Sequence, residues 1–295
     1  MIRSISVFST LTAAFLANTF AGMTPGPVQA QDQPAFETTR IADGVYRFRW
    51  QAHVGMFVVG DDGVVAFDPI NPEAAATFAS EIKRVAGDKP LRWIVYSHSD
   101  LDHASGGNVM SEAFGGGVPI VATAASVDDI AAHDDPAQPL PTVTFERFMS
   151  LDLGGITVEL HYFGPSHSDN LLVGYAPEAR VAFAVDFVNN DRVGFRNLPG
   201  WHFPAQNTSI RRMMGLEFET VIYGHGDVGD RASMWRQAQY YDALETVVRN
   251  AIADGLSEDQ AAQRIRLPEF ESFGGYGDWF ELNVRGAYQT ISGGM

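Results

Sequence analysis

The fold and the chemistry of this chain are indicated first by residues 96–108, which read YSHSDLDHASGGN. This stretch holds four potential metal ligands within six residues: His98, Asp100, Asp102 and His103. It follows the apolar run 91–96, which is typical of a short buried strand, and its glycines predict a loop that enters a helix near Ala104. Imidazoles and carboxylates at a strand's end can converge on one point or on two adjacent points, as a divalent metal requires.

Three later strand-like runs also end in short segments with potential ligands. The segment GPSHSDN at 164–170 carries His167, FAVD at 183–186 ends at Asp186, and YGHGD at 223–227 carries His225. A chance cluster of polar residues would not be expected to recur in this way after several strands. The set therefore favours a metal centre assembled from loops that are distant in sequence.

These four segments resemble, in order and in spacing, the metal-binding motifs of the metallo-β-lactamase-fold superfamily. The first is similar to the family's His-x-His-x-Asp-His, with Asp100 in place of the second histidine. The resemblance covers roughly Ile41 to Asp230. It implies an α/β fold, the four-layer αββα sandwich, with the site in a cleft at one edge of the sheets. Strand-like runs in two groups, each flanked by helical patterns, agree with this architecture.

The resemblance also implies a ligand set for two divalent ions. His98, Asp100 and His167 would hold the first ion, and Asp186 would lie between the two. The second would be held by Asp102, His103 and His225. Zinc is the ion expected, with iron or manganese as alternatives, because a carboxylate-rich site suits harder ions.

Asp100 leaves three interpretations open: it ligates, it is too short and leaves one tightly bound ion at the second site, or it marks a lapsed site in a binding protein. Ligation is favoured, because a carboxylate oxygen is as many bonds from Cβ as the Nδ1 atom it would replace. A third carboxylate makes the site less positive, so a bound water would ionise at a higher pH than in a histidine-rich site.

Composition sets further bounds. The 295 residues include 45% hydrophobic residues, enough for a large core, and no cysteine, so a metal must use nitrogen and oxygen ligands. The net charge of −16 disfavours nucleic acid as a partner. Neither a Gly-x-Ser-x-Gly motif nor a phosphate-binding glycine loop is present.

Residues 1–30 are predicted to be a signal peptide. Arg3 precedes a mostly apolar run, and Val28-Gln29-Ala30 offers a small-x-small cleavage site. We therefore expect a periplasmic or secreted protein with no stable membrane insertion after cleavage. Residues 31–295 would form a single domain, with a C-terminal helical extension from about residue 231.

Other expectations concern the surroundings of the site. His53, Trp201 and His202 are candidate residues of a substrate pocket, whereas His133 is expected in a solvated surface loop. Asp68 either points at the site as a partner of a ligand or only caps a turn. Residues 71–87 are predicted to be a helix with Asn71 at its N-cap, and residues 142–149 a single strand.

Three functions remain open at this point. The first is an exported metal-dependent hydrolase of a small molecule, in which a metal-bound hydroxide, oriented by Asp102, attacks an ester, lactone or amide carbonyl. The second is a non-haem iron enzyme that acts on oxygen or on sulfur compounds. The third is a non-catalytic binding protein with a lapsed site. The sequence does not name the substrate.

Overall fold

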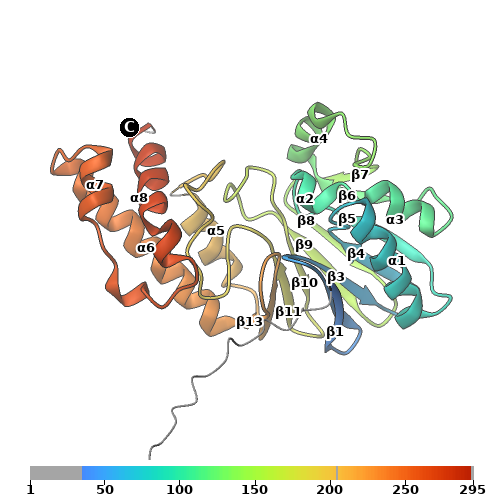
Figure 1. Cartoon of the computed structure of the whole chain (residues 1–295). Coiled ribbons are helices and arrows are strands. Elements are labelled where there is room, and N and C mark those ends of the chain that lie inside the picture. Colours follow the sequence, from blue (N-terminus) through green and yellow to red (C-terminus); the bar gives the residue numbers. More distant parts are fainter. Residues whose placement is uncertain (1–34, 204, 294–295) are drawn as a thin grey trace, which may run out of the picture. The chain divides into compact units, whose positions relative to one another are not determined.

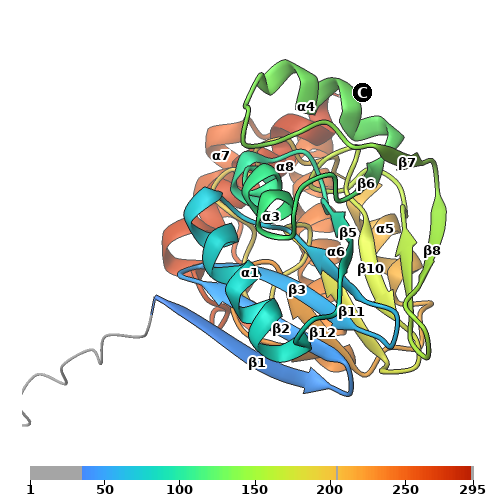
Figure 2. The same ribbon diagram turned by 90° about the vertical axis from the view of Figure 1, so that its right-hand side faces the viewer.

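The computed structural model describes residues 35–203 and 205–293, and Figures 1 and 2 show their arrangement from two sides. The predicted signal peptide and its cleavage site lie outside the described residues. Two mixed β-sheets form the centre of the described part. The first has the strand order β1-β2-β3-β4-β5-β6-β7, and the second has the order β13-β12-β11-β10-β9-β8.

The first sheet is built by the N-terminal half of the chain. Strands β1 to β4 are joined by antiparallel pairing, and β4 to β7 pair in parallel, with helices between them. Its strands are β1 (Phe36–Ala42), β2 (Val45–Trp50), β3 (His53–Val59), β4 (Val64–Phe67), β5 (Leu91–Val95), β6 (Ile120–Thr123) and β7 (Val143–Phe145). The intervening helices are α1 (Pro72–Ala86), α2 (Leu101–Ala104), α3 (Gly107–Ala113), η1 (Ala124–Ser126) and α4 (Val127–His133).

The second sheet follows in the chain. Its strands pair antiparallel except for β11 and β12, which pair in parallel. The helix α5 (Ala205–Met213) connects these two strands in the sequence. The strands are β8 (Phe148–Asp152), β9 (Thr157–His161), β10 (Val173–Ala176), β11 (Val181–Ala184), β12 (Thr220–Tyr223) and β13 (Gly229–Asp230). The chain then continues as α6 (Arg231–Ala253), α7 (Glu258–Arg264), η2 (Pro268–Phe270) and α8 (Tyr276–Gly293).

Three clusters of buried apolar side chains correspond to the three interfaces between four layers. One lies between the sheets, where the rings of Phe67 and Phe183 meet at 5.5 Å. A second packs α1, through Phe78 and Ile82, against the outer face of the first sheet, and a third packs α5, α6 and α8 against the second sheet. Figure 1 shows the same order, with α1 and α3 on one side and α5 to α8 on the other. The predicted αββα sandwich is confirmed.

The local signals placed most elements correctly. The Asn71 side chain accepts a hydrogen bond from the backbone N–H of Ala74, and Pro72 occupies the first helical position. Gly87 ends the same helix with a φ of 63°, a conformation that glycine adopts without strain.

Among the described residues, no helix combines the length and the apolar character that a membrane crossing requires.

Two expected elements differ from the structure. Residues 142–149 are not one strand: β7 ends the first sheet, Glu146 and Arg147 carry the chain across, and β8 is the edge strand of the second sheet. Glu146, Arg147 and Phe148 are all exposed, but the buried Phe145 and Leu151 on either side are both odd-numbered, so periodicity alone did not reveal the crossing. The helix expected from Ala104 instead begins at Leu101, with Asp100 at the N-cap, and restarts at Gly107.

Candidate metal centre

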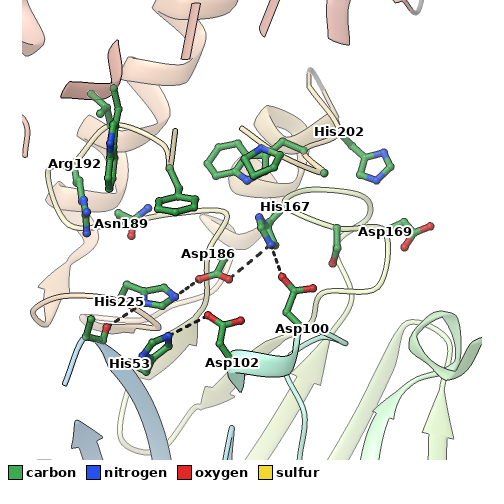
Figure 3. A pocket seen from close by; sticks show the side chains of 18 residues that line it. His53, Asp100, Asp102, His167, Asp169, Asp186, Asn189, Arg192, His202 and His225 are labelled. Atoms are coloured by element: carbon green, nitrogen blue, oxygen red, sulfur yellow. Dashed lines mark hydrogen bonds and ion pairs between the residues drawn. The ribbon is translucent and has the colours of Figure 1, made fainter. Parts of the chain in front are cut away.

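The ends of four strands bring the predicted ligands together. Residues 98–103 follow β5, His167 lies in the loop between β9 and β10, Asp186 follows β11, and His225 follows β12. Both sheets therefore contribute to one site, and Figure 3 shows Asp100, Asp102, His167, Asp186 and His225 pointing into a common pocket. Asp186 has a φ of 60°, a left-handed conformation that costs on the order of 1–3 kcal/mol for a residue other than glycine. Such strain is typical of functional positions.

The first group of donors is His98, Asp100, His167 and Asp186, whose ligand atoms lie within 4.8 Å of one another. An Asp100 Oδ2 atom lies 3.1 Å from His167 Nε2 and 3.4 Å from His98 Nε2. The Asp100 carboxylate therefore reaches the position at which the histidines converge. This is the geometry that ligation by Asp100 requires.

A second group contains His103, Asp186 and His225, and a third contains His53, Asp102 and His225. The Nε2 atoms of His103 and His225 are 3.2 Å apart. The Oδ2 atom of Asp186 lies 3.3 Å from the first of these nitrogens, and its Oδ1 atom lies 3.0 Å from the second. Asp186 thus belongs to both the first and the second group, which places it between the two sets of donors. Asp102 lies farther out: its Oδ2 is 3.7 Å from His103 Nε2, and its side chain is about half exposed (52%).

Partners outside the site determine which nitrogen of two histidines faces inward. Asp68 is fully buried and accepts hydrogen bonds from the backbone N–H and the hydroxyl of Ser97, at 2.8 Å and 2.7 Å. Since that hydroxyl donates to Asp68, it accepts from Nδ1–H of His98, at 2.9 Å. The Nδ1–H of His103 donates to Asp68 itself, at 3.0 Å. Of the two roles considered for Asp68, the structure favours that of a partner to the ligands.

The third inward-facing histidine is fixed in the same way. Nδ1 of His225 lies 3.0 Å from the carbonyl oxygen of Ala52, which can only accept, so this nitrogen carries the proton. The Nε2 atoms of His103 and His225 then present lone pairs to each other at 3.2 Å, an arrangement that a cation between them would stabilise. Nε2 of His98 is also buried without a hydrogen bond from any described residue. The donor set therefore fits divalent metal ions.

The site is electrostatically coupled. Burial opposes the charged form of His98, but the carboxylates of Asp100 and Asp186, each 3.4 Å from its Nε2, outweigh burial and raise the pKa of this imidazole to about 9. Burial likewise disfavours the ionised form of Asp186, yet His103, His225 and His98 hold its pKa well below the usual range. For Asp102, the hydrogen bond from His53 and nearby imidazoles outweigh burial and lower the pKa to about 2.

His53 enters the site more deeply than its sequence context indicates. It is the first residue of β3, at the tip of the β2–β3 hairpin, and its Nε2 lies 3.1 Å from Asp102 Oδ2. The backbone N–H of Val54 donates to the carbonyl of Gly224 at 2.9 Å, so the hairpin tip is fastened beside His225. No local motif marks His53, because the hydrogen bond that places its hairpin joins Val54 to Gly224, 170 residues later in the sequence.

The donors open into a cavity of about 750 Å³. Trp201 and His202, predicted as pocket residues, both line it, and the Trp201 ring stands edge-on to His167 with centroids 6.0 Å apart. His133 lies apart from it, at the end of α4, and pairs with Gln138. The lining residues that the sequence did not single out include Asn189, Arg192 and Trp279. No sequence motif marks a pocket lined by arginine and tryptophan, and Trp279 belongs to α8, which is far in sequence from the other residues that line the cavity.

The fold and the donor set define a member of a known class. A sequence model of the metallo-beta-lactamase superfamily matches residues 49–225, more than half of the chain, and the protein belongs to this superfamily. Solved structures agree in fold. A metallo-beta-lactamase from Pontibacter korlensis has a TM-score of 0.61 at 21% identity, covering 70% of this chain and 99% of that one. VMB-1 has a TM-score of 0.60 at 16% identity, covering 70% and 97%.

Curated relatives come from Nocardioides sp. (strain JS1661). The alpha subunit of 2,4-dinitroanisole O-demethylase is 26% identical over 226 residues, which are 75% of this chain and 65% of the subunit. The beta subunit is 23% identical over 239 residues, covering 77% of this chain and 71% of the subunit. The chain thus spans slightly less than two thirds of the alpha subunit.

Proposed function

We propose that this protein is a metal-dependent hydrolase of a small molecule, with an ester, lactone or amide carbonyl as the first class of reacting group. The observation that carries the proposal is that two sets of donors share Asp186 and open into one cavity. Two divalent ions held there, with zinc favoured over iron or manganese, would lower the pKa of a bound water and stabilise negative charge on the attacked oxygen.

The roles of the residues follow from their positions. His98, Asp100 and His167 would hold one ion, His103, His225 and Asp102 the other, and Asp186 would contact both. Asp102 lines the cavity, and its pKa of about 2 keeps it ionised at neutral pH. So acidic a carboxyl group is a weak proton acceptor, and we infer that it orients the attacking water through a hydrogen bond. The imidazole of His53 contacts Oδ2 of Asp102 and would thereby fix the orientation of this carboxylate.

A second candidate is cleavage of an electron-poor aryl ether. It is favoured by the O-demethylase relatives and by the aromatic side chains that line the cavity, Phe195, Trp201 and Trp279. In a hydrolytic route, the oxygen of water bonds to the ring carbon, the bond from that carbon to the methoxy oxygen breaks, and methanol leaves with the proton. An iron-dependent oxidation with O₂ and two electrons from an added reductant would instead release the methyl carbon as formaldehyde, with the second oxygen atom leaving as water.

Metal content and product analysis separate these alternatives. Protein purified without added metal is analysed for zinc, iron and manganese, then assayed with 4-nitrophenyl acetate, a lactone panel and 2,4-dinitroanisole, in air and without oxygen. We expect turnover that does not need oxygen, with methanol as the product from the ether. Stoichiometric iron with oxygen-dependent formaldehyde would replace the hydrolase with the iron enzyme. Absence of turnover together with absence of bound metal would favour a binding protein.

Single variants test the ligand set. His103→Ala and His225→Ala each remove a direct donor, so we expect loss of activity and a lower metal content. His133→Ala is the matched control, because His133 pairs with Gln138 away from the donors. If the control lost as much metal as His225→Ala, the assignment of ligands would be wrong.

We also propose that the chain is exported, on the basis of the leader pattern in residues 1–30. Protein recovered from the periplasm or medium should begin near Gln31. A mature protein that begins at Met1 would contradict this proposal.

A further inference from the structure

Helix α8 follows the end of the superfamily match at residue 225, yet it contributes to the pocket. Its Trp279 lies under Arg192, with the guanidinium carbon 4.6 Å from the centroid of the ring. Phe195 meets Trp279 edge-on, with centroids 5.1 Å apart and planes at 83°. We call Asn189, Arg192, Phe195 and Trp279 the α8 wall. All four line the same cavity as the donor groups.

Buried contacts fasten the loop of this wall to α8. Asn283 is fully buried, and its Oδ1 accepts from the backbone N–H of Gly194 at 2.9 Å. Its Nδ2 donates to the carbonyls of Gly194 and Arg196, at 2.9 Å and 2.7 Å. At Gly286, a Cβ atom would lie only 1.9 Å from the carbonyl oxygen of Asn197, so the helix and the loop approach as closely as glycine allows. The wall is therefore a built surface with a defined shape.

Arg192 is the single arginine or lysine among the described residues that line the cavity. Within the described part of the chain, it forms no ion pair with a carboxylate. The aspartates that line the cavity include Asp100, Asp102 and Asp186, which the metal ions would neutralise. A guanidinium stacked on an indole keeps its planar fork of N–H donors, which matches two coplanar oxygens. Figure 3 shows Asn189 beside Arg192, on the side of the pocket where His225 lies.

We propose that the α8 wall selects a planar aromatic substrate that carries a pair of coplanar oxygens, a carboxylate or a nitro group, and that Arg192 binds those oxygens. This inference rests on the proposed function, because it concerns the substrate of the same site. The aromatic body packs against Phe195 and Trp279, and Asn189 offers an additional donor. With the oxygens held at the His225 side, the reacting bond extends toward the donors around Asp186.

The test measures binding and needs no turnover. Calorimetry with zinc-loaded protein compares 4-methoxybenzoate, 4-nitroanisole and 4-methylanisole, which carry a carboxylate, a nitro group and neither. We expect Arg192→Gln to weaken the first or the second ligand by about tenfold or more, as for the loss of a charge-assisted contact, and to leave the third unchanged. Whichever of the two binds wild type more tightly identifies the group that the wall prefers.

Arg196→Gln is the matched control. Arg196 lies in the same loop and stacks on Phe195 at 4.9 Å, but it does not line the cavity. Its substitution should change none of the three affinities. Equal binding of all three ligands to wild type, or equal losses in the two arginine variants, would overturn the assignment of Arg192.

A second variant tests the contribution of the helix. Trp279→Leu removes the ring that contacts Arg192 and leaves the side chain of Asn283, with its hydrogen bonds to the loop, in place. We expect this variant to bind all three ligands more weakly, with an unchanged zinc content. Unchanged affinities would remove α8 from the recognition surface. Arginine-dependent binding in a protein that hydrolyses nothing would sink only the proposed function. Hydrolysis with a KM that is insensitive to Arg192→Gln would sink only the wall.

Discussion

At the scale of single residues, Asp100 is where this chain departs from the histidine pattern that its motif resembles. Its carboxylate oxygen lies 3.1 Å from His167 Nε2, close to the atoms that would share an ion with it. We expect Asp100→His to retain the bond through Nδ1, to make the site more positive by one charge, and to hold zinc more readily relative to iron or manganese. A bound water would then ionise at lower pH, so the acidic limb of the activity profile should move to lower pH.

Metal analysis and pH–rate profiles of wild type and variant check this expectation. An unchanged metal ratio together with an unmoved limb would show that Asp100 does not ligate. One ion at the second site would then replace the two-ion assignment.

His98 provides a second prediction at this scale. Its pKa, raised to about 9 in the chain alone, means that the imidazole carries a proton at neutral pH until an ion displaces it. This protonation stabilises the metal-free fold fully below the ordinary pKa of 6.5, and the contribution is lost as the pH rises through about 9. The pH dependence of metal binding has the opposite sign, because the ion and the proton compete for the same imidazole of His98. The apparent affinity for the metal should therefore rise with pH up to about 9.

Calorimetric titration of zinc into chelator-treated protein at pH 7.5, in buffers of different ionisation enthalpy, measures the protons released. We expect release in wild type and a smaller release in His98→Gln, which lacks the imidazole. An affinity that is flat between pH 6 and 9 would contradict the competition.

At the scale of elements, local rules worked where one segment determines its own structure. Asn71, Pro72 and Gly87 marked both ends of α1, and Ser257 caps α7 through a capping box with Gln260, a pattern that the sequence also contains. They failed where the partner is remote. The switch of sheets at Glu146 has no local signature, and His53 joins the site only through the pairing of its hairpin with the loop after β12. The convergence of the four donor-bearing segments could be predicted because each carries its own motif at a strand's end.

The cap of α1 gives a prediction at this scale. Asn71→Ala removes the acceptor for the backbone N–H of Ala74 and should lower the free energy of unfolding by about 1 kcal/mol. Asn71→Asp keeps a side-chain oxygen in place and serves as the control, with a stability close to that of wild type. Urea denaturation of zinc-loaded protein measures both. Equal losses in the two variants would show that the side chain acts through something other than the cap.

At the scale of the whole molecule, the donors lie on both sheets, so ions bound by them would link two layers of the sandwich. His98 and His103 follow a strand of the first sheet, whereas Asp186 and His225 follow strands of the second. Since this arrangement exists only in the folded chain, an ion that binds it stabilises the fold by mass action, by about 2.7 kcal/mol at a free concentration of 100 times the dissociation constant. For a domain of this size, that stabilisation corresponds to a rise in Tm of roughly 5–10 °C.

We therefore expect chelator treatment to lower Tm by an amount in this range and added zinc to restore it, as measured by differential scanning calorimetry. Asp186→Asn weakens the donor that both groups share, so its Tm should respond much less to zinc, whereas Arg196→Gln should respond as wild type does. A Tm that zinc shifts equally in wild type and Asp186→Asn would mean that the stabilising ion binds elsewhere. A response intermediate between wild type and Asp186→Asn in Asp100→Ala would show that the first group of donors holds an ion of its own, because Asp100 belongs to that group alone.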